Sequence, residues 1–259
     1  MKIKAYRVYA FVGPGCRGNG AGVCILDDWK PDSMLLNIAQ HFNFSETAFF
    51  IPSQNKFELR WFSPKVEVDL CGHATLAAAS IIFEVMHILS RDVVFSTISG
   101  DLKVSRYTDL YYMEFPKREG QIVETNLMLE VGLGLKPDSV LKSRDYIAIY
   151  SSEEAILEIQ PDFQKLCELD GFGVVITAPG KQCDFVSRFF GPKVGINEDP
   201  VTGSSHCSLI PYWAKRLNKN TLYAQQLSKA KGELFCENLT DRVKMGGRAW
   251  IEAEETLNI

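Results

Sequence analysis

Glu46 is the residue of this sequence whose surroundings best suit proton-transfer chemistry. It directly precedes the run Thr-Ala-Phe-Phe-Ile at 47–51, where a carboxylate is costly to bury unless it is hydrogen-bonded. Such surroundings disfavour the charged form and raise the pKa toward the range in which a carboxyl group exchanges protons near neutral pH. The alternative is that Glu46 lies at an exposed strand end, and the sequence leaves both interpretations open.

Two turns rich in small and polar residues are the second feature that could do chemistry. Residues 71–75 read Cys-Gly-His-Ala-Thr and residues 198–204 read Glu-Asp-Pro-Val-Thr-Gly-Ser, and each turn precedes a pattern that predicts a helix. The first amides of a helix bind anions. Taken singly, His73 is typical of a hydrogen-bonded histidine at a helix start, and Asp199 and Ser204 are typical helix caps. Their repeated setting favours a functional role.

An internal repeat connects the two turns. Arg-Trp-Phe-Ser-Pro-Lys-Val at 60–66 returns as Arg-Phe-Phe-Gly-Pro-Lys-Val at 188–194, 128 positions later (188 − 60). The repeat predicts two related lobes, each presenting a helix N-terminus to a shared cleft. A Pro- and Gly-containing break at 116–120 places the boundary, so we expect an N-terminal lobe over 1–116 and a C-terminal lobe over 117–245. A last strand within 246–259 could return to either lobe.

The pattern of apolar residues predicts alternating strands and helices in both halves. Strands are expected at 3–12, 22–26, 47–51, 57–62, 93–97, 102–106, 110–115, 145–150, 173–177, 184–190 and 243–251, and helices at 31–42, 74–89, 125–131 and 204–217. The helix at 74–89 is apolar all round and should be the buried centre of its lobe. Pro211 should kink the helix at 204–217, because proline removes one amide donor.

Three other motifs are weaker than they look. The glycines at 13, 15 and 18 match a dinucleotide-binding fingerprint, but a turn and a strand follow them instead of a helix, so we interpret them as a hairpin loop. Cys71 with His73, and His206 with Cys207, lack the second ligand pair and the spacing of a zinc site, so no metal is expected. Ser204 lacks the Gly-x-Ser-x-Gly elbow of a hydrolase nucleophile.

Composition excludes several classes of protein. The chain of 259 residues is 46% apolar, which is enough to bury a substantial core, and its formal net charge is −4. Its 28 Lys and Arg residues form no run that could neutralise a nucleic-acid backbone, so no nucleic-acid partner is expected. No signal peptide and no membrane-spanning apolar run is evident, and the seven cysteines lack paired spacing, so we expect no membrane association and a cytoplasmic location.

Together, the motifs resemble those of the phenazine-biosynthesis-like (PhzF-like) family. The segments that carry the resemblance are Gly-Asn at 18–19, Ser-Glu-Thr-Ala at 45–48, and the longer stretches 67–76 and 198–207, with further similarity at 184–192 and 244–247. The resemblance spans the whole chain, and the combination is specific although each segment alone is not. Gly20 and Tyr9 depart from the family, which usually has proline and aspartate at these positions.

The resemblance implies an α/β fold of the diaminopimelate-epimerase type. Two pseudo-symmetric lobes, each a curved mixed sheet around a central helix, would place the active site in the cleft between them. The family pattern implies that Glu46 transfers the proton, with His73 and Asp199 as further catalytic groups. Asn19, Gly72, Gly203 and Ser204 are expected to bind the substrate. A homodimer is also implied.

Reaction chemistry narrows the function to a cofactor-independent isomerase of a small carboxylated metabolite. Epimerisation normally needs an acid and a base on opposite faces of the same carbon. In the epimerases that this chain resembles, two cysteines, one from each lobe, would be that acid and base. Here Cys71 matches one thiol, but Thr202 stands where the second is expected. One carboxylate, Glu46, can instead move a proton along a conjugated system on a single face. An amino-acid racemase or epimerase, and a non-catalytic metabolite-binding protein, are the alternatives.

Overall fold

The computed structural model describes residues 2–258, which divide into two compact units. Residues up to Glu114, together with those from Gly246 onward, form the first unit, and Phe115–Met245 form the second. Among residues 2–258, the helices are too short or too polar to cross a membrane.

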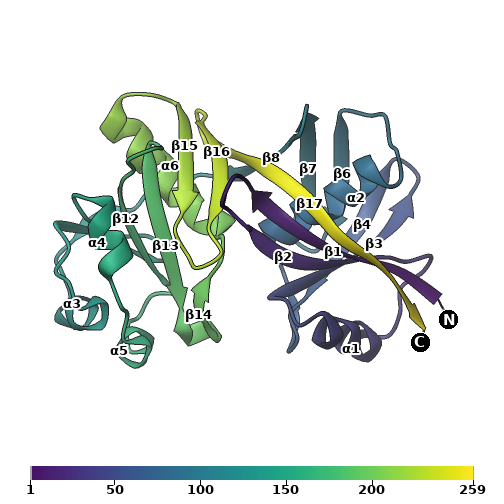
Figure 1. The fold of residues 1–259 in the computed structure, drawn as a ribbon, viewed down its shortest axis with the longest axis horizontal. Helices are drawn as coiled ribbons and strands as arrows, with labels where there is room; N and C mark the ends of the chain where they lie inside the picture. The colour runs from purple at the N-terminus through teal and green to yellow at the C-terminus, as the bar shows by residue number, and fades with distance from the viewer. Residues whose placement is uncertain (1, 259) are drawn as a thin grey trace. The chain divides into compact units, whose positions relative to one another are not determined.

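Eight strands of the first unit close into a mixed barrel (Figure 1). Their order around the barrel is β1 (Lys2–Val12), β2 (Asn19–Ile25), β3 (Glu46–Ser53), β4 (Lys56–Phe62), β6 (Asp92–Thr97), β7 (Gly100–Tyr107), β8 (Leu110–Pro116) and β17 (Arg242–Asn258), which pairs with both β8 and β1. The β2–β3 and β4–β6 pairs are parallel. The short strand β5 (Glu67–Val68) pairs with β4. The mixed α/β class predicted from the sequence is confirmed.

Helix α2 (Gly72–Glu84) fills this barrel. Every residue from His73 to Phe83 is buried, which only a helix enclosed on all sides can achieve. Its alanines allow the surrounding strands to approach closely. The predicted helix over 74–89 was wrong at its end: α2 stops at Glu84, and Leu89 is 99% exposed. The apolar pattern continues past the barrel, but nothing in the described structure packs against Leu89.

Helix α1 (Asp32–Phe42) confirms the helix predicted at 31–42, and it covers the outside of the barrel. Leu35, Ile38 and Phe42 pack in one core cluster with Phe49 and Phe62 of the barrel strands. The glycine-rich segment at 13–18 connects β1 to β2, which begins directly after it at Asn19, and these two strands are antiparallel. The rejection of a dinucleotide-binding fingerprint is therefore confirmed.

The second unit contains an open mixed sheet with helices on both faces (Figure 1). Its strands follow the order β9 (Gln121–Val123), β10 (Ser139–Lys142), β11 (Tyr146–Ile149), β12 (Val174–Pro179), β13 (Phe185–Gly191), β15 (Thr221–Gln226) and β16 (Gly232–Asn238), and β14 (Ile196–Asp199) also pairs with β13. A 3-10 turn, η1 (Pro192–Val194), joins β13 to β14.

The two faces of this sheet pack against different helices. Val186 and Phe190 of β13 join a core with α3 (Leu127–Leu133), α4 (Glu153–Glu158) and α5 (Phe163–Cys167). Phe185, one residue along, stacks on Trp213 of α6 (Gly203–Leu217), as the two-residue period of a strand requires. Helix α6 continues through Pro211, where a kink was expected.

Several elements of the second unit were not predicted. Helices α4 and α5 span six and five residues, too few to show a helical period, and are fixed instead by Ser152 and Asp162, which cap them. Strands β15 and β16 were also missed. The last predicted strand at 243–251 was too short: β17 runs on to Asn258, and its residues 248–258 pair with β1, as the yellow and purple strands in Figure 1 show.

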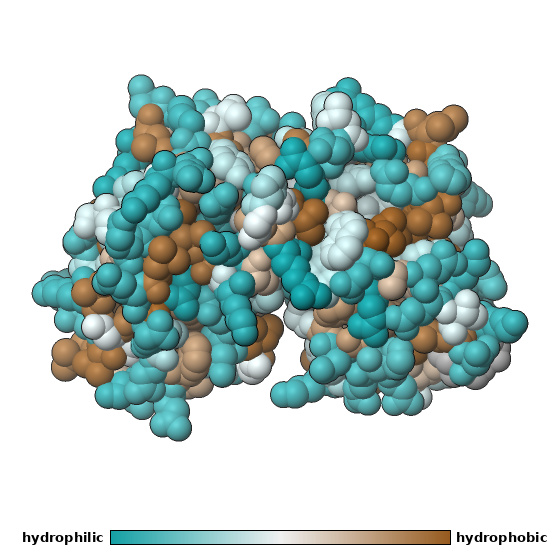
Figure 2. Space-filling model, viewed as in Figure 1, coloured by the Kyte–Doolittle hydropathy of each residue, from teal (hydrophilic) through white to brown (hydrophobic). Residues whose placement is uncertain are grey.

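The surface is mixed in character. Figure 2 shows a face on which hydrophilic residues predominate and apolar residues occur in small groups. Scattered exposed apolar residues are normal for a folded protein. This face therefore shows no single functional region, whereas polar side chains cluster at the starts of α2 and α6.

Candidate functional site

The first cluster lies where β2, β3 and α2 begin. Glu46 is the first residue of β3, and Asn19 is the first residue of β2. These two strands run parallel, with Ala21 opposite Glu46, so their starting ends lie close together. Cys71 is the N-cap of α2 and His73 lies in its first turn. Three elements far apart in the sequence thus supply one group of side chains.

His73 contacts every other side chain of this cluster. Its Nε2 lies 3.4 Å from Glu46 Oε2 and 3.5 Å from Ser45 Oγ. Its Nδ1 lies 3.5 Å from both Asn19 Nδ2 and Cys71 Sγ. The Cys71 thiol also donates to Glu46 Oε2 at 3.6 Å. These contacts are long for hydrogen bonds, so the cluster leaves its groups capable of changing partners when a substrate binds.

The environment of Glu46 raises its pKa. Burial is the main cause, since only 15% of the side chain is exposed, and hydrogen bonds from Ser45 and Cys71 oppose the rise without cancelling it. The interpretation of Glu46 as an exposed strand end is therefore wrong. A carboxyl group whose pKa is raised from its ordinary value can gain and lose a proton closer to neutral pH.

Glu46, Cys71 and His73 also form a set of metal donors. Each offers one ligand atom, and the three atoms lie within 4.8 Å of one another. Thiol, imidazole and carboxylate groups suit zinc, whose structural sites take four protein ligands and whose catalytic sites take three and an open position. The donor chemistry fits zinc as well as proton transfer, so chelation belongs among the tests of function.

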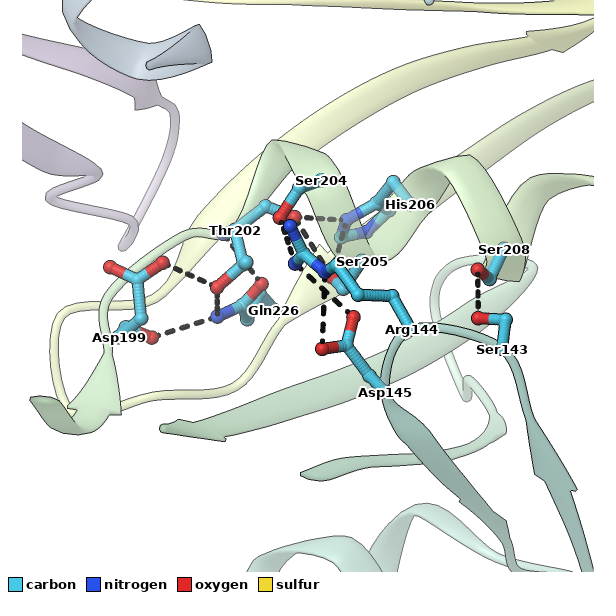
Figure 3. A network of polar contacts seen from close by, with 10 residues as sticks. All are labelled: Ser143, Arg144, Asp145, Asp199, Thr202, Ser204, Ser205, His206, Ser208 and Gln226. Atoms are coloured by element: carbon cyan, nitrogen blue, oxygen red, sulfur yellow. Dashed lines mark hydrogen bonds and ion pairs between the residues drawn. The ribbon is translucent and has the colours of Figure 1, made fainter. Parts of the chain in front are cut away.

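The second cluster surrounds the start of α6 (Figure 3). Thr202, the N-cap residue, donates from its hydroxyl to Asp199 Oδ2 at 2.5 Å. Gln226, buried at the end of β15, accepts from the Thr202 amide at 2.9 Å and donates to the Asp199 carbonyl oxygen at 2.8 Å. One carboxamide thus holds both the backbone of Asp199 and the residue that begins the helix.

His206 is a structural residue of this cluster. It is completely buried, and burial lowers its pKa to about 4, so the ring is neutral. Its Nδ1 donates to the Thr202 carbonyl oxygen at 2.8 Å. Ser205 donates to the same oxygen at 2.8 Å. Both side chains therefore fix the first turn of α6 from within.

Arg144 contacts the start of α6 at Ser204 (Figure 3). Its Nη2 donates to Ser204 Oγ at 2.9 Å, and its guanidinium also faces the buried carboxylate of Asp145 and the ring of Phe172. Arg144, Asp145 and Gln226 were missed by sequence reasoning. Nothing in their local sequence marks them, because they reach α6 only through the fold.

The side chains of Cys71 and Thr202, the N-cap residues of α2 and α6, do not cap the helices they begin. By contrast, α3, α4 and α5 of the second unit each have a capping side chain. The first amides of α2 and α6 therefore receive no bond from the residue that usually supplies one. Gly72 and Gly203, the first residues of these helices, add no side chain beside those amides.

The predicted site residues fall into these two clusters. Asn19, Glu46, Gly72 and His73 come together in the first unit. Asp199, Gly203 and Ser204 come together around the start of α6 in the second unit. The sequence motifs thus identified real polar clusters.

The closed barrel with its buried central helix gives this chain an epimerase-like α/β fold. The hydroxyproline epimerase of Agrobacterium vitis has this fold, with a TM-score of 0.65 at 11% identity over 99% of this chain and 92% of its own. A family model described as phenazine biosynthesis-like protein matches residues 8–255. The chain belongs to this phenazine biosynthesis-like family.

Relatives with much higher identity give the class of enzyme. An uncharacterized isomerase of Pseudomonas aeruginosa is 45% identical over the whole of both chains. The crystal structure of a PhzF-family phenazine biosynthesis protein from Enterococcus faecalis matches with a TM-score of 0.97 at 42% identity, covering both chains completely. The chain is an isomerase of the PhzF type.

Proposed function

We propose that this isomerase moves a proton within a small carboxylated metabolite without a cofactor, and that Glu46 carries the proton. The observation behind the proposal is the setting of Glu46, whose carboxyl group is largely buried, has a raised pKa and lies within reach of His73 and Cys71. A general acid or base is most effective when its pKa lies close to the working pH, and the raised pKa of Glu46 moves in that direction.

The reaction begins when ionised Glu46 removes a proton from a carbon next to the substrate's conjugated system. The protonated carboxyl group then returns that proton to another carbon of the same system, on the same face. Negative charge develops on the substrate between the two steps. Amides at a helix start stabilise such charge, and we assign this task to the turns that contain Gly72 and Gly203. His73 and Asp199 orient the substrate or relay protons, and Asn19 and Ser204 bind it.

The N-cap residues support isomerisation over two-thiol epimerisation. Cys71 and Thr202 occupy the same position, the N-cap, in α2 and α6. A second thiol at the start of α6 would supply the second acid or base, but Thr202 has a hydroxyl group that remains protonated at neutral pH. Cys207, further along α6, is buried and its pKa is raised to about 11, which makes it unsuited to that role.

A deuterium-incorporation screen tests the proposal. Candidate carboxylated metabolites are incubated with the protein in D2O, and products are read by NMR and mass spectrometry. Glu46→Gln should lower the rate by roughly a hundredfold to ten-thousandfold, the usual contribution of a general acid or base. Glu254→Gln, which changes an exposed glutamate of the same unit, is the matched control and should leave the rate unchanged. Undiminished turnover in Glu46→Gln would falsify the assignment.

Two further arms of the screen address cofactor and metal. Prolonged dialysis against a chelator, which removes any zinc held by Glu46, Cys71 and His73, should leave the rate intact if the reaction needs no metal. Restoration of a lost rate by zinc alone would instead make the enzyme metal-dependent. Stabilisation by a metabolite without any labelled product would favour a binding protein over an enzyme.

A racemase or epimerase is the second candidate, and the contact between Cys71 and Glu46 favours it. A thiol 3.6 Å from the carboxylate could act as the second proton carrier. This reaction places solvent deuterium at a single carbon whose configuration inverts. Cys71→Ser would then abolish inversion, whereas double-bond isomerisation would tolerate the change.

Location and assembly complete the proposal. None of the seven cysteines, all of which the structure describes, forms a disulfide; this supports a reducing compartment, and we assign the enzyme to the cytoplasm. We also propose a homodimer, whose mass light scattering measures directly. Neither assignment depends on the chemistry of Glu46.

A further inference from the structure

The repeat detected in the sequence has a structural counterpart in each unit, an arginine–glutamate pair placed just before a helix start. In the first unit, Arg60 on β4 donates to both carboxylate oxygens of Glu67, from Nε and Nη2, each at 2.7 Å. In the second, Arg188 on β13 donates from the same two nitrogens to Glu198, at 2.7 and 3.1 Å. Two parallel hydrogen bonds of this kind fix orientation as well as distance.

The two pairs occupy equivalent places in their units. The residue after each arginine pairs across the sheet with the residue after its glutamate, Trp61 with Val68 and Phe189 with Asp199. Each guanidinium also lies over the phenylalanine two positions on, at 5.0 Å from the ring centroid of Phe62 and 4.9 Å from that of Phe190.

The equivalence continues into the helices. In both units the N-cap residue follows the glutamate by four positions: Cys71 follows Glu67, and Thr202 follows Glu198. In both, the residue four positions after the N-cap donates back to the N-cap carbonyl oxygen, Thr75 through its hydroxyl and His206 through its imidazole. The segment from glutamate to helix start is therefore one repeated structural device.

A third partner anchors each arginine to a helix outside the sheet. Arg60 Nη2 donates to Asp32, the first residue of α1, at 2.8 Å. Arg188 Nη1 donates to the carbonyl oxygens of Ile156 and Ile159 at the end of α4, at 3.0 and 2.8 Å. Each arginine thus ties the chain that leads into the helix start to a fixed outer element.

We infer that Arg188 and Glu198 are positioning residues for substrate binding, and that Arg60 and Glu67 are positioning residues for proton transfer. The first pair holds the strand end that carries Asp199 and leads to Ser204. The second holds the strand that leads to Cys71 and His73, the neighbours of Glu46. The inference rests on the proposed function and narrows it: Asp199 orients the substrate, and His73 relays the proton that Glu46 carries. Neither pair touches the reacting atoms.

Kinetics of four variants test the inference, using the substrate that the deuterium screen identifies. Arg188→Lys keeps the charge but cannot form the two-pronged bond, and Glu198→Gln keeps the shape but removes the charge. Both should raise KM by about 10- to 100-fold, the scale of a displacement of about an ångström, with kcat close to that of the wild type. Arg60→Lys and Glu67→Gln should lower kcat instead. Their effect should be smaller, because Arg60 and Glu67 are more exposed.

The charges of the second pair provide the decisive comparison. If Glu198 acted only through its charge on an anionic substrate, Glu198→Gln would lower KM and Arg188→Lys would change nothing. Positioning predicts that both variants raise it. A fall in KM for Glu198→Gln therefore overturns the inference, as does wild-type kinetics in Arg188→Lys.

Hydrogen exchange measures positioning without any substrate, so it separates this inference from the proposed function. In Glu198→Gln, amides 203–205 at the start of α6 should exchange faster than in the wild type, with the distal half of α6 unchanged. The control is Glu237→Gln, which removes a half-buried ion-paired glutamate from the same unit. Unchanged exchange at 203–205 contradicts the inference even if Glu46 proves catalytic. A uniform increase over the whole unit would show a folding defect and also count against it.

Discussion

At the scale of the single residue, burial raises the pKa of Glu46 and thereby affects both its chemistry and the stability of the fold. The carboxyl group lies at the first position of β3, with 15% of its side chain exposed and with a thiol and an imidazole beside it. An acid with a raised pKa is bound to its proton more tightly in the folded state than in the unfolded chain. The same shift that suits proton transfer therefore lowers stability once Glu46 ionises.

Because the pKa of Glu46 is raised in the folded state, the stability of the protein should depend on pH. Below its ordinary pKa, Glu46 is protonated in both states and costs nothing. As pH rises from that value through the raised pKa, the unfolded chain releases the proton first and the folded protein loses stability. Glu46→Gln, neutral throughout, should unfold at a higher temperature than the wild type at pH 7, and the difference should shrink toward pH 4.

The expected gain at pH 7 is about 1.4 kcal/mol for each unit by which the folded-state pKa is raised. Exposed Glu254→Gln should show no such dependence on pH. A gap between Glu46→Gln and wild type that stays constant from pH 4 to pH 7 would show that Glu46 titrates normally in the folded protein.

The two departures from the family pattern are neighbours in the structure. Tyr9 pairs directly with Gly20 across β1 and β2, and its ring packs edge-on against Phe44 at 5.7 Å. A Cβ atom at position 20 would lie 2.5 Å from the Phe44 ring and 3.1 Å from that of Tyr9. Glycine at position 20 therefore makes room for the aromatic pair, and the two departures are one change in packing.

Gly20→Ala should consequently destabilise the protein by about 1–3 kcal/mol, the usual cost of overpacking a core. The loss should be much smaller in a Phe44→Ala background, where the clash is removed. Urea denaturation of the two single variants and the double variant gives the coupling energy. Strictly additive free energies of unfolding would mean that Phe44 is not what excludes a side chain at position 20.

At the scale of elements, the starts of α2 and α6 were predictable and their supports were not. In each case a turn of small residues followed by apolar residues at helical spacing predicted the helix. In the structure, α2 begins at Gly72 and α6 at Gly203. Gln226 and Arg144 could not be found in this way, because each reaches α6 from a distant strand or turn. Local patterns reveal where a helix starts, whereas long-range contacts decide how its start is held.

Gln226 offers a direct test of such a support. Gln226→Met keeps the volume of this fully buried side chain but leaves the Thr202 amide and the Asp199 carbonyl oxygen without their partner. Each buried group left unsatisfied costs about 1–3 kcal/mol. We expect a loss in that range or above by urea denaturation, whereas Gln225→Met on the same strand should have little effect. Equal stability of the two variants would show that Gln226 does not support the start of α6.

At the scale of the whole molecule, the internal repeat explains both what the sequence revealed and what it concealed. The repeated segment at 60–66 and 188–194 correctly marked two strands with the same role in two units. The copies then drift apart: Arg60 and Arg188 are 128 positions apart, but Glu67 and Glu198 are 131 apart (198 − 67), because the turn after β13 is longer. Short helices such as α4 fall outside the repeated motif, so no second copy helped to predict them.

The final strand shows how chain order and fold diverge. Residues 248–258 pair with β1, at the other end of the sequence, and their partners run from Val12 back to Lys2. The apolar alternation of 243–251 revealed a strand but not its extent, since the rest of β17 alternates mostly polar residues. The length of β17 is therefore determined by its hydrogen-bonded pairing with β1 and not by local hydrophobicity.

Truncation before residue 249 should therefore open the barrel of the first unit. It removes the partner of β1 over almost its whole length and takes Leu257 from the cluster beneath α1. An open strand edge with unpaired amides favours aggregation. We expect a broad, non-cooperative thermal transition and larger species in size-exclusion chromatography. Removal of residues 258–259 alone should preserve a cooperative transition, and a chain ending at 248 that unfolded as cooperatively as the wild type would show that β17 is not needed to close the barrel.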